Sequence, residues 1–77
     1  MKYFEVKIGE VLTLCDKADH ALTSMEKYTI KDTCSDLQNR LHLKSTSSAE
    51  ALIEISGLRD EILLTVLRRT GIDLSKA

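Results

Sequence analysis

The chain has 77 residues and a formal net charge of −1, so it holds at most one domain and offers no overall positive field that would attract a polyanion. It contains no proline, three glycines, 4% aromatic and 30% charged residues, a composition typical of an all-helical chain. A chain this short buries only about 60–65% of its unfolded surface, which favours the association of subunits as an additional source of stability.

Cysteine content and hydropathy bear on the cellular compartment. Cys15 and Cys34 do not form a disulfide framework and indicate free thiols in a reducing environment. Glu5 lies where a signal peptide needs an apolar core, and no segment approaches the roughly 18–20 apolar residues of a membrane span. We therefore expect a cytoplasmic protein that has no contact with membranes.

A regular apolar pattern opens the chain. In steps of four and three residues it places Phe4, Ile8, Val11, Cys15, Ala18, Leu22 and Met25. This coiled-coil-like spacing predicts one amphipathic helix over residues 2–28 that packs against other helices. A second interpretation is open for residues 2–8, because Phe4, Val6 and Ile8 also alternate with charged residues and Gly9 would end a strand. Those residues would then form a short strand or an extended arm.

A shorter helix is predicted over residues 30–43. Thr29 followed by Asp32 resembles a capping box, and the apolar residues that follow keep the same spacing. Asp36 and Arg40 are placed to pair one turn apart. Such a helix would be only about 20 Å long. The hydroxyl-rich residues 44–48 then form a loop.

The third helix, over residues 48–70, has the best-marked ends. Ser47 and Glu50 fit a capping box, Arg68 and Arg69 place cations in the last turn, and Gly71 follows as a left-handed stop. Its apolar stripe is broad enough to touch two neighbouring helices and comprises Ala51, Leu52, Ile55, Leu58, Ile62, Leu63, Val66 and Leu67.

These elements predict an all-α single domain over residues 1–77, either an elongated helical hairpin or a three-helix bundle. A short middle helix would leave parts of both long stripes uncovered, and exposed apolar patches usually mark interfaces. We therefore expect the protein interface at Phe4, Ile8, Val11, Ile62, Val66 and Leu67.

No constellation of catalytic, cofactor-binding or metal-ligating residues is recognisable. Cys15, His20, Cys34 and His42 lack the close pairing of zinc ligands. Cys15 and His20 are five residues apart, a spacing that turns a nucleophile and its base away from each other on a helix. We expect a protein that is not an enzyme and that needs neither a cofactor nor a metal.

The function expected from this pattern is protein–protein interaction. The module would self-associate, as a dimer, and bind or mask an unidentified partner protein, in the manner of a small chaperone, inhibitor or adaptor. The alternative is a small dimeric DNA-binding regulatory protein with a basic patch formed by Arg40, His42, Lys44, Arg59, Arg68 and Arg69. Nucleic acid is the less favoured partner, because the tight turn of a helix-turn-helix is missing between the second and third predicted helices.

Overall fold

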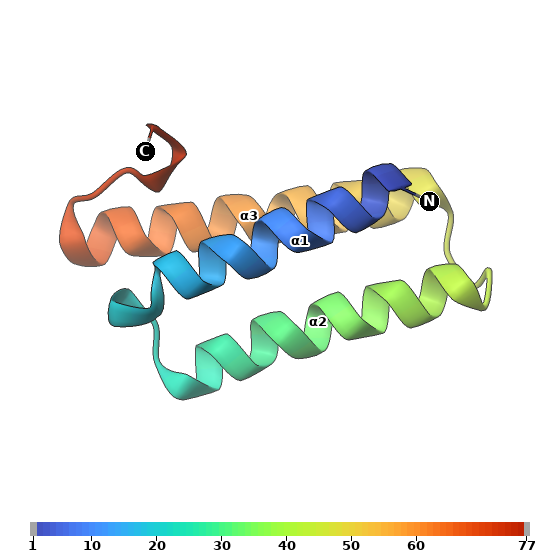
Figure 1. The fold of residues 1–77 in the computed structure, drawn as a ribbon, viewed down its shortest axis with the longest axis horizontal. Helices are drawn as coiled ribbons and strands as arrows, with labels where there is room; N and C mark the ends of the chain where they lie inside the picture. The colour runs from blue at the N-terminus through green and yellow to red at the C-terminus, as the bar shows by residue number, and fades with distance from the viewer. Residues whose placement is uncertain (1, 77) are drawn as a thin grey trace.

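The computed structural model describes residues 2–76 and, within them, contains three α-helices and no strand. The helices are α1 (Lys2–Lys17), α2 (Ser24–His42) and α3 (Ser48–Thr70), with short 3-10 turns η1 (Asp19–Ala21) and η2 (Leu74–Lys76). In Figure 1, α1 and α3 run in the same direction, and α2, which lies below both in this view, runs in the opposite one. The predicted all-α fold is confirmed as a three-helix bundle.

The first residues of the described chain are helical, so the strand interpretation of residues 2–8 is wrong. A strand would place Phe4, Val6 and Ile8 on one face, whereas a helix turns Val6 away from the other two. In the structure Phe4 and Ile8 are buried and Val6 is exposed. Burial of the helical pair against two neighbouring helices therefore decides the conformation.

The first helix ends at Lys17, so the prediction of one helix over residues 2–28 is wrong. The break is set by a capping box between Thr23 and Glu26, which the regular apolar spacing around it conceals. The Thr23 hydroxyl accepts a hydrogen bond from the Glu26 N–H at 3.1 Å, and the Glu26 carboxylate accepts one from the Thr23 N–H at 2.9 Å. The apolar spacing continues through the turn because Ala18 and Leu22 both remain in the core.

The middle helix is longer than expected, since residues 24–28 belong to α2 rather than to α1. With 19 residues it spans about 28 Å, close to the length of its neighbours. The start predicted at Thr29 is wrong: this residue lies inside α2, and its hydroxyl donates to the Met25 carbonyl at 2.9 Å. A helix of this length can cover the apolar stripes of both α1 and α3.

The third helix agrees with its prediction at both ends. The Ser47 hydroxyl accepts a hydrogen bond from the Glu50 N–H at 3.2 Å. Gly71 ends the helix with a φ of +75°, a left-handed conformation that favours glycine, and its N–H donates to the Leu67 carbonyl at 2.8 Å.

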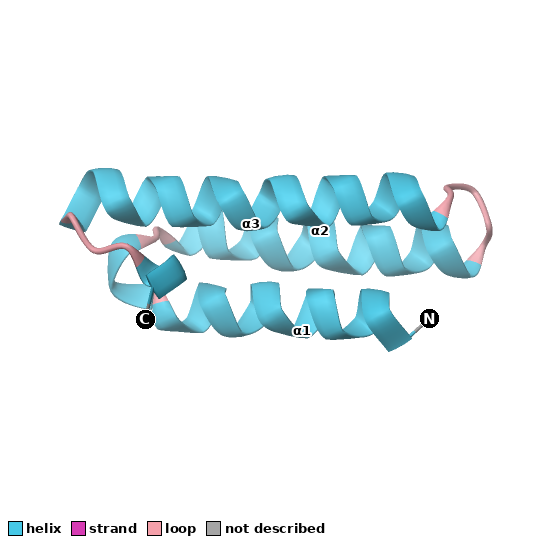
Figure 2. Ribbon diagram, turned by 90° about the horizontal axis from the view of Figure 1, so that it is seen from above, coloured by secondary structure: helices cyan, strands magenta, loops and turns pink. Residues whose placement is uncertain are grey.

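The core is one continuous apolar cluster along the bundle axis, and no polar or charged residue of the described range is buried in it. Its members are Phe4, Ile8, Val11, Cys15, Ala18, Leu22, Ile30, Cys34, Leu37, Ala51, Ile55, Ile62 and Val66. The bundle measures 38 × 25 × 15 Å. Figure 2 shows the three helices side by side, with η2 folded back toward the end of α1, where Leu74 packs on the core. None of the helices in residues 2–76 combines the length and the apolar character that crossing a membrane requires.

Candidate interaction surface

Five of the six predicted interface residues lie inside the single chain. Phe4, Ile8, Val11, Ile62 and Val66 are all buried in the core, and the sixth residue of that set, Leu67, is 42% exposed. The expectation that all six would be uncovered rested on a short middle helix, and it is wrong for five of them because the longer α2 covers both stripes. While the bundle is folded, these five side chains expose at most 3% of their surface to a partner.

A different apolar pattern faces outward on α3. Ile53 is 73% exposed, Leu64 50% and Leu67 42%. Together with Gly57 and Asp60 they follow steps of four and three residues, which place all five on the helix face turned away from the core. A Cβ atom added to Gly57 would meet nothing within 4 Å, so the surface is open there. We call this set the outer stripe; its spacing is present in the sequence, but the neighbouring core stripe hides it.

An open groove of about 230 Å³ runs along the contact between α2 and α3. Its floor is apolar and consists of Leu22, Ile30, Leu58 and Ile62, and its walls include Met25, Thr29, Glu61 and Thr65. Met25 is strongly exposed at the rim. The sequence offered no direct signal for this groove, because it depends on how two helices that are adjacent in the chain pack together.

Two interhelical ion pairs link α2 to α3. Arg40 contacts Glu54 of α3 at 2.6 Å and Asp36 of its own helix at 3.0 Å, the latter as the sequence predicted. Arg69 holds both carboxylate oxygens of Glu26, at 2.6 and 2.9 Å. Glu26 and Arg40 are about four helical turns apart, roughly 21 Å along α2. The two interhelical ion pairs, Arg40–Glu54 and Arg69–Glu26, therefore lie at opposite ends of the α2–α3 contact.

Arg69 also ties the turn between α1 and α2 to the end of α3. Its guanidinium donates to the Ala21 carbonyl at 2.8 Å while it holds Glu26, which in turn accepts the Thr23 N–H. The hydrogen bonds from Arg69, and after them the backbone hydrogen bond from Thr23, lower the pKa of Glu26 to about 2. The Glu26 carboxylate thus serves both a helix cap and an interhelical contact.

This network predicts a specific loss of stability in acid. Because the pKa of Glu26 is lower in the folded chain than its ordinary 4.5, its contribution is fully present above pH 4.5 and is lost as the pH falls toward about 2. Thermal unfolding of the wild type and of Glu26→Gln, measured from pH 7 to pH 2, should show a difference in Tm that shrinks over that interval. A difference that stays constant with pH would contradict the assignment.

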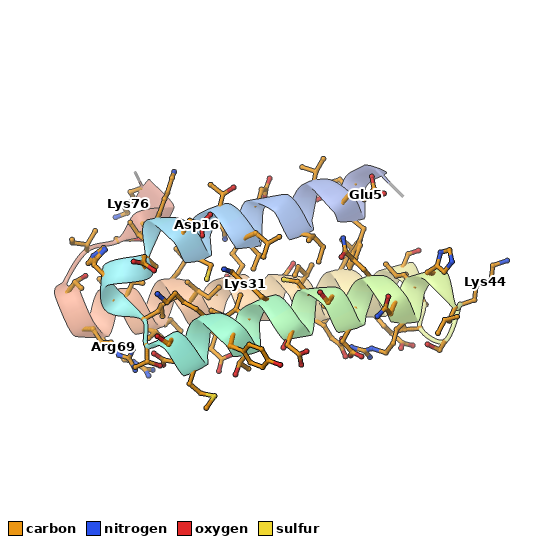
Figure 3. All side chains as sticks on the ribbon, turned by 60° about the horizontal axis from the view of Figure 1, so that its bottom comes forward. Glu5, Asp16, Lys31, Lys44, Arg69 and Lys76 are labelled. Atoms are coloured by element: carbon orange, nitrogen blue, oxygen red, sulfur yellow. The ribbon has the colours of Figure 1, made fainter. Side chains whose placement is uncertain are left out.

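The basic residues of the predicted DNA-binding patch are not gathered on one surface. Arg40 and Arg69 form the two interhelical ion pairs, and Arg59 lies 3.8 Å from Asp60. Figure 3 shows Lys44 and Arg69 at opposite ends of the bundle. His42 and Lys44 are near the α2–α3 loop, whereas Arg68 and Arg69 are in the last turn of α3. The six cations therefore do not form the continuous patch that a DNA backbone requires.

The four residues considered for metal binding or catalysis are separated by the fold. Cys15 and Cys34 are buried as free thiols in the core, and burial raises the pKa of both. His20 lies in η1 and His42 at the end of α2, both exposed. Within residues 2–76, no group of three or more histidine, cysteine, aspartate or glutamate side chains is arranged to hold a metal ion.

Comparison with known proteins assigns no family and no function to this chain. The chain matches no protein family, no curated protein and no solved structure. A role for the bundle is therefore inferred from its own surface, on which the outer stripe and the α2–α3 groove are two apolar features.

Proposed function

We propose that this bundle is a small, non-enzymatic protein–protein interaction module of the cytoplasm that self-associates as a dimer and binds or masks a partner protein. The observation that carries the proposal is the outer stripe, because large apolar residues at coiled-coil spacing on an exposed helix face favour packing against another helix. The two free thiols, Cys15 and Cys34, fit a reducing compartment. A chaperone-, inhibitor- or adaptor-like role would use the same surface chemistry.

The outer stripe is suited to an antiparallel contact with α3 of a second copy. In such a pair centred near Asp60, Ile53 of one copy lies beside Leu67 of the other, and the small Gly57 receives the large Leu64. Arg68 flanks the stripe on the same side as Glu54, whose carboxylate is already held by Arg40 of its own chain. The fit of the large Leu64 against the small Gly57 is therefore what favours this arrangement over a parallel one.

Asp60 sets a limit on the strength of the dimer. It lies in the middle of the outer stripe, so the antiparallel pair places two like charges close together, which opposes association. We expect a weak dimer with a Kd of about 10 μM or more. Asp60→Asn should tighten the dimer by removing this repulsion.

Leu64→Glu should abolish self-association without unfolding the chain. Static light scattering at about 10 to 500 μM should show the wild type passing from monomer to dimer, and this variant remaining monomeric, because a charge would have to be buried in the stripe. Circular dichroism should show unchanged helix content, since Leu64 is half-exposed in the single chain.

The matched control is Leu43→Glu, the same change at an exposed residue at the end of α2 that lies outside the outer stripe. It should associate like the wild type. A wild type that stays monomeric over the whole concentration range, or an equal effect of both substitutions, would refute the proposed dimer.

The DNA-binding alternative has no such supporting surface, because its cations are dispersed and partly engaged in ion pairs. A gel shift with duplex DNA at about 50 mM salt, where phosphate contacts are strongest, tests it directly. We expect no shift.

A further inference from the structure

Asp60 is the charged member of the outer stripe, and it lies at the centre of that stripe. The stripe runs from Ile53 to Leu67, which is about 21 Å of helix. Ile53 and Gly57 precede Asp60, and Leu64 and Leu67 follow it, all on the face of α3 that is turned away from the core. A helix that covers the stripe must therefore cover this carboxylate as well.

Asp60 is only weakly paired within the single chain. Its side chain is 69% exposed, and its ion pair with the adjacent Arg59 is long, at 3.8 Å. An exposed pair of this length contributes little, because water screens both charges. A helix that lies on the stripe removes that water, and the carboxylate then needs a close cation from the partner.

The charges along the two edges of the stripe do not select a partner by their sign. They are Glu50, Glu54, Glu61 and Arg68 on the edge toward α2, and Arg59 on the edge toward α1. Both signs occur there, and Arg40 of α2 already holds Glu54 at 2.6 Å. The selection therefore falls to the carboxylate in the middle of the apolar face.

We propose that the outer stripe binds an amphipathic helix of a partner protein that carries large apolar residues at the same steps of four and three, and a lysine or arginine opposite Asp60. This inference rests on the proposed function and names the class of partner for the same surface. A second copy of this chain is the weaker occupant, because it brings another Asp60 to that position. The partner helix should therefore displace the second copy.

The probe is a pair of synthetic helical peptides of about 18 residues, long enough to cover the stripe. Both carry leucines at steps of four and three on one face. They differ only at the central position of that face, which is lysine in one peptide and glutamate in the other. In about 150 mM salt the lysine peptide should bind at least about tenfold more tightly, as measured by fluorescence anisotropy. Amide shifts in NMR spectra should change around Ile53, Gly57 and Leu64.

The variant that tests the charge is Asp60→Lys, which should reverse the preference between the two peptides. Asp60 is exposed, so its replacement leaves the core intact. The matched control is Asp32→Lys, the same change at an exposed residue of α2, which should keep the preference of the wild type. Equal binding of both peptides, binding of neither, an unchanged preference in Asp60→Lys, or shifts confined to α1 and α2 would each overturn the inference.

The dimer and the partner helix fail separately. A monomeric wild type that prefers the lysine peptide would refute only the dimer. A dimeric wild type that binds neither peptide, or binds both equally, would refute only the class of partner. Added to a dimeric wild type, the lysine peptide should lower the mass measured by light scattering, because the peptide and the second copy cover the same stripe. A dimer that binds the peptide and keeps its mass would place the peptide elsewhere and overturn the inference.

Discussion

Replacing Leu37 with alanine is expected to lower the free energy of unfolding by about 2 to 5 kcal/mol. Leu37 is 0% exposed and lies on the face of α2 that packs into the core. Its removal leaves a cavity that the surrounding helices fill only in part, because their backbones are held by the rest of the core. A chain of this size has a stability of only about 4 to 12 kcal/mol, so the variant should be close to unfolding.

Urea unfolding followed by circular dichroism measures this effect. The control is Leu43→Ala, the same substitution at the end of the same helix, where the side chain is 74% exposed. It should change stability by no more than about 0.5 kcal/mol, since few contacts are lost. Similar losses in both variants would mean that Leu37 is not enclosed as the structure has it.

Val11→Asp is expected to unfold the chain. Val11 is buried where α1 meets the other helices, and no cation of the core is available to pair with a carboxylate there, because no charged residue of the described range is buried. Burying an unpaired carboxylate costs several kcal/mol, comparable to the entire stability of so small a domain. Circular dichroism at 25 °C should show most of the helical signal lost, at low and at high protein concentration alike.

The matched control for this prediction is Val6→Asp on the exposed side of α1. Val6 is in contact with solvent, so the variant should keep its helix content and nearly its full stability. The apolar pattern alone led us to expect an interface at Val11, where a charge would dissociate an assembly. A folded but monomeric Val11→Asp would support that earlier expectation and contradict the burial seen here.

The sequence predicted the third helix well because its signals are local. Ser47 and Glu50 mark its start through hydrogen bonds within one turn, and Gly71 marks its end through a conformation that other residues adopt with strain. The break after Lys17 was missed for the opposite reason. Ala18 and Leu22 are spaced as in a continuous helix, although they reach the core from a turn, and the capping box at Thr23 competes with that pattern.

Local signals along the chain are sufficient to predict that it is all-helical, how α3 begins and ends, and which residues can form a core. The tertiary structure decided which apolar stripe is covered, because α3 carries one stripe around Ile55 and Ile62 and another around Ile53 and Leu64. Periodicity identifies both, but only the packing of α1 and α2 against the first leaves the second exposed. The α2–α3 groove likewise exists only once the two helices lie together, since a groove belongs to a pair of helices and not to either one.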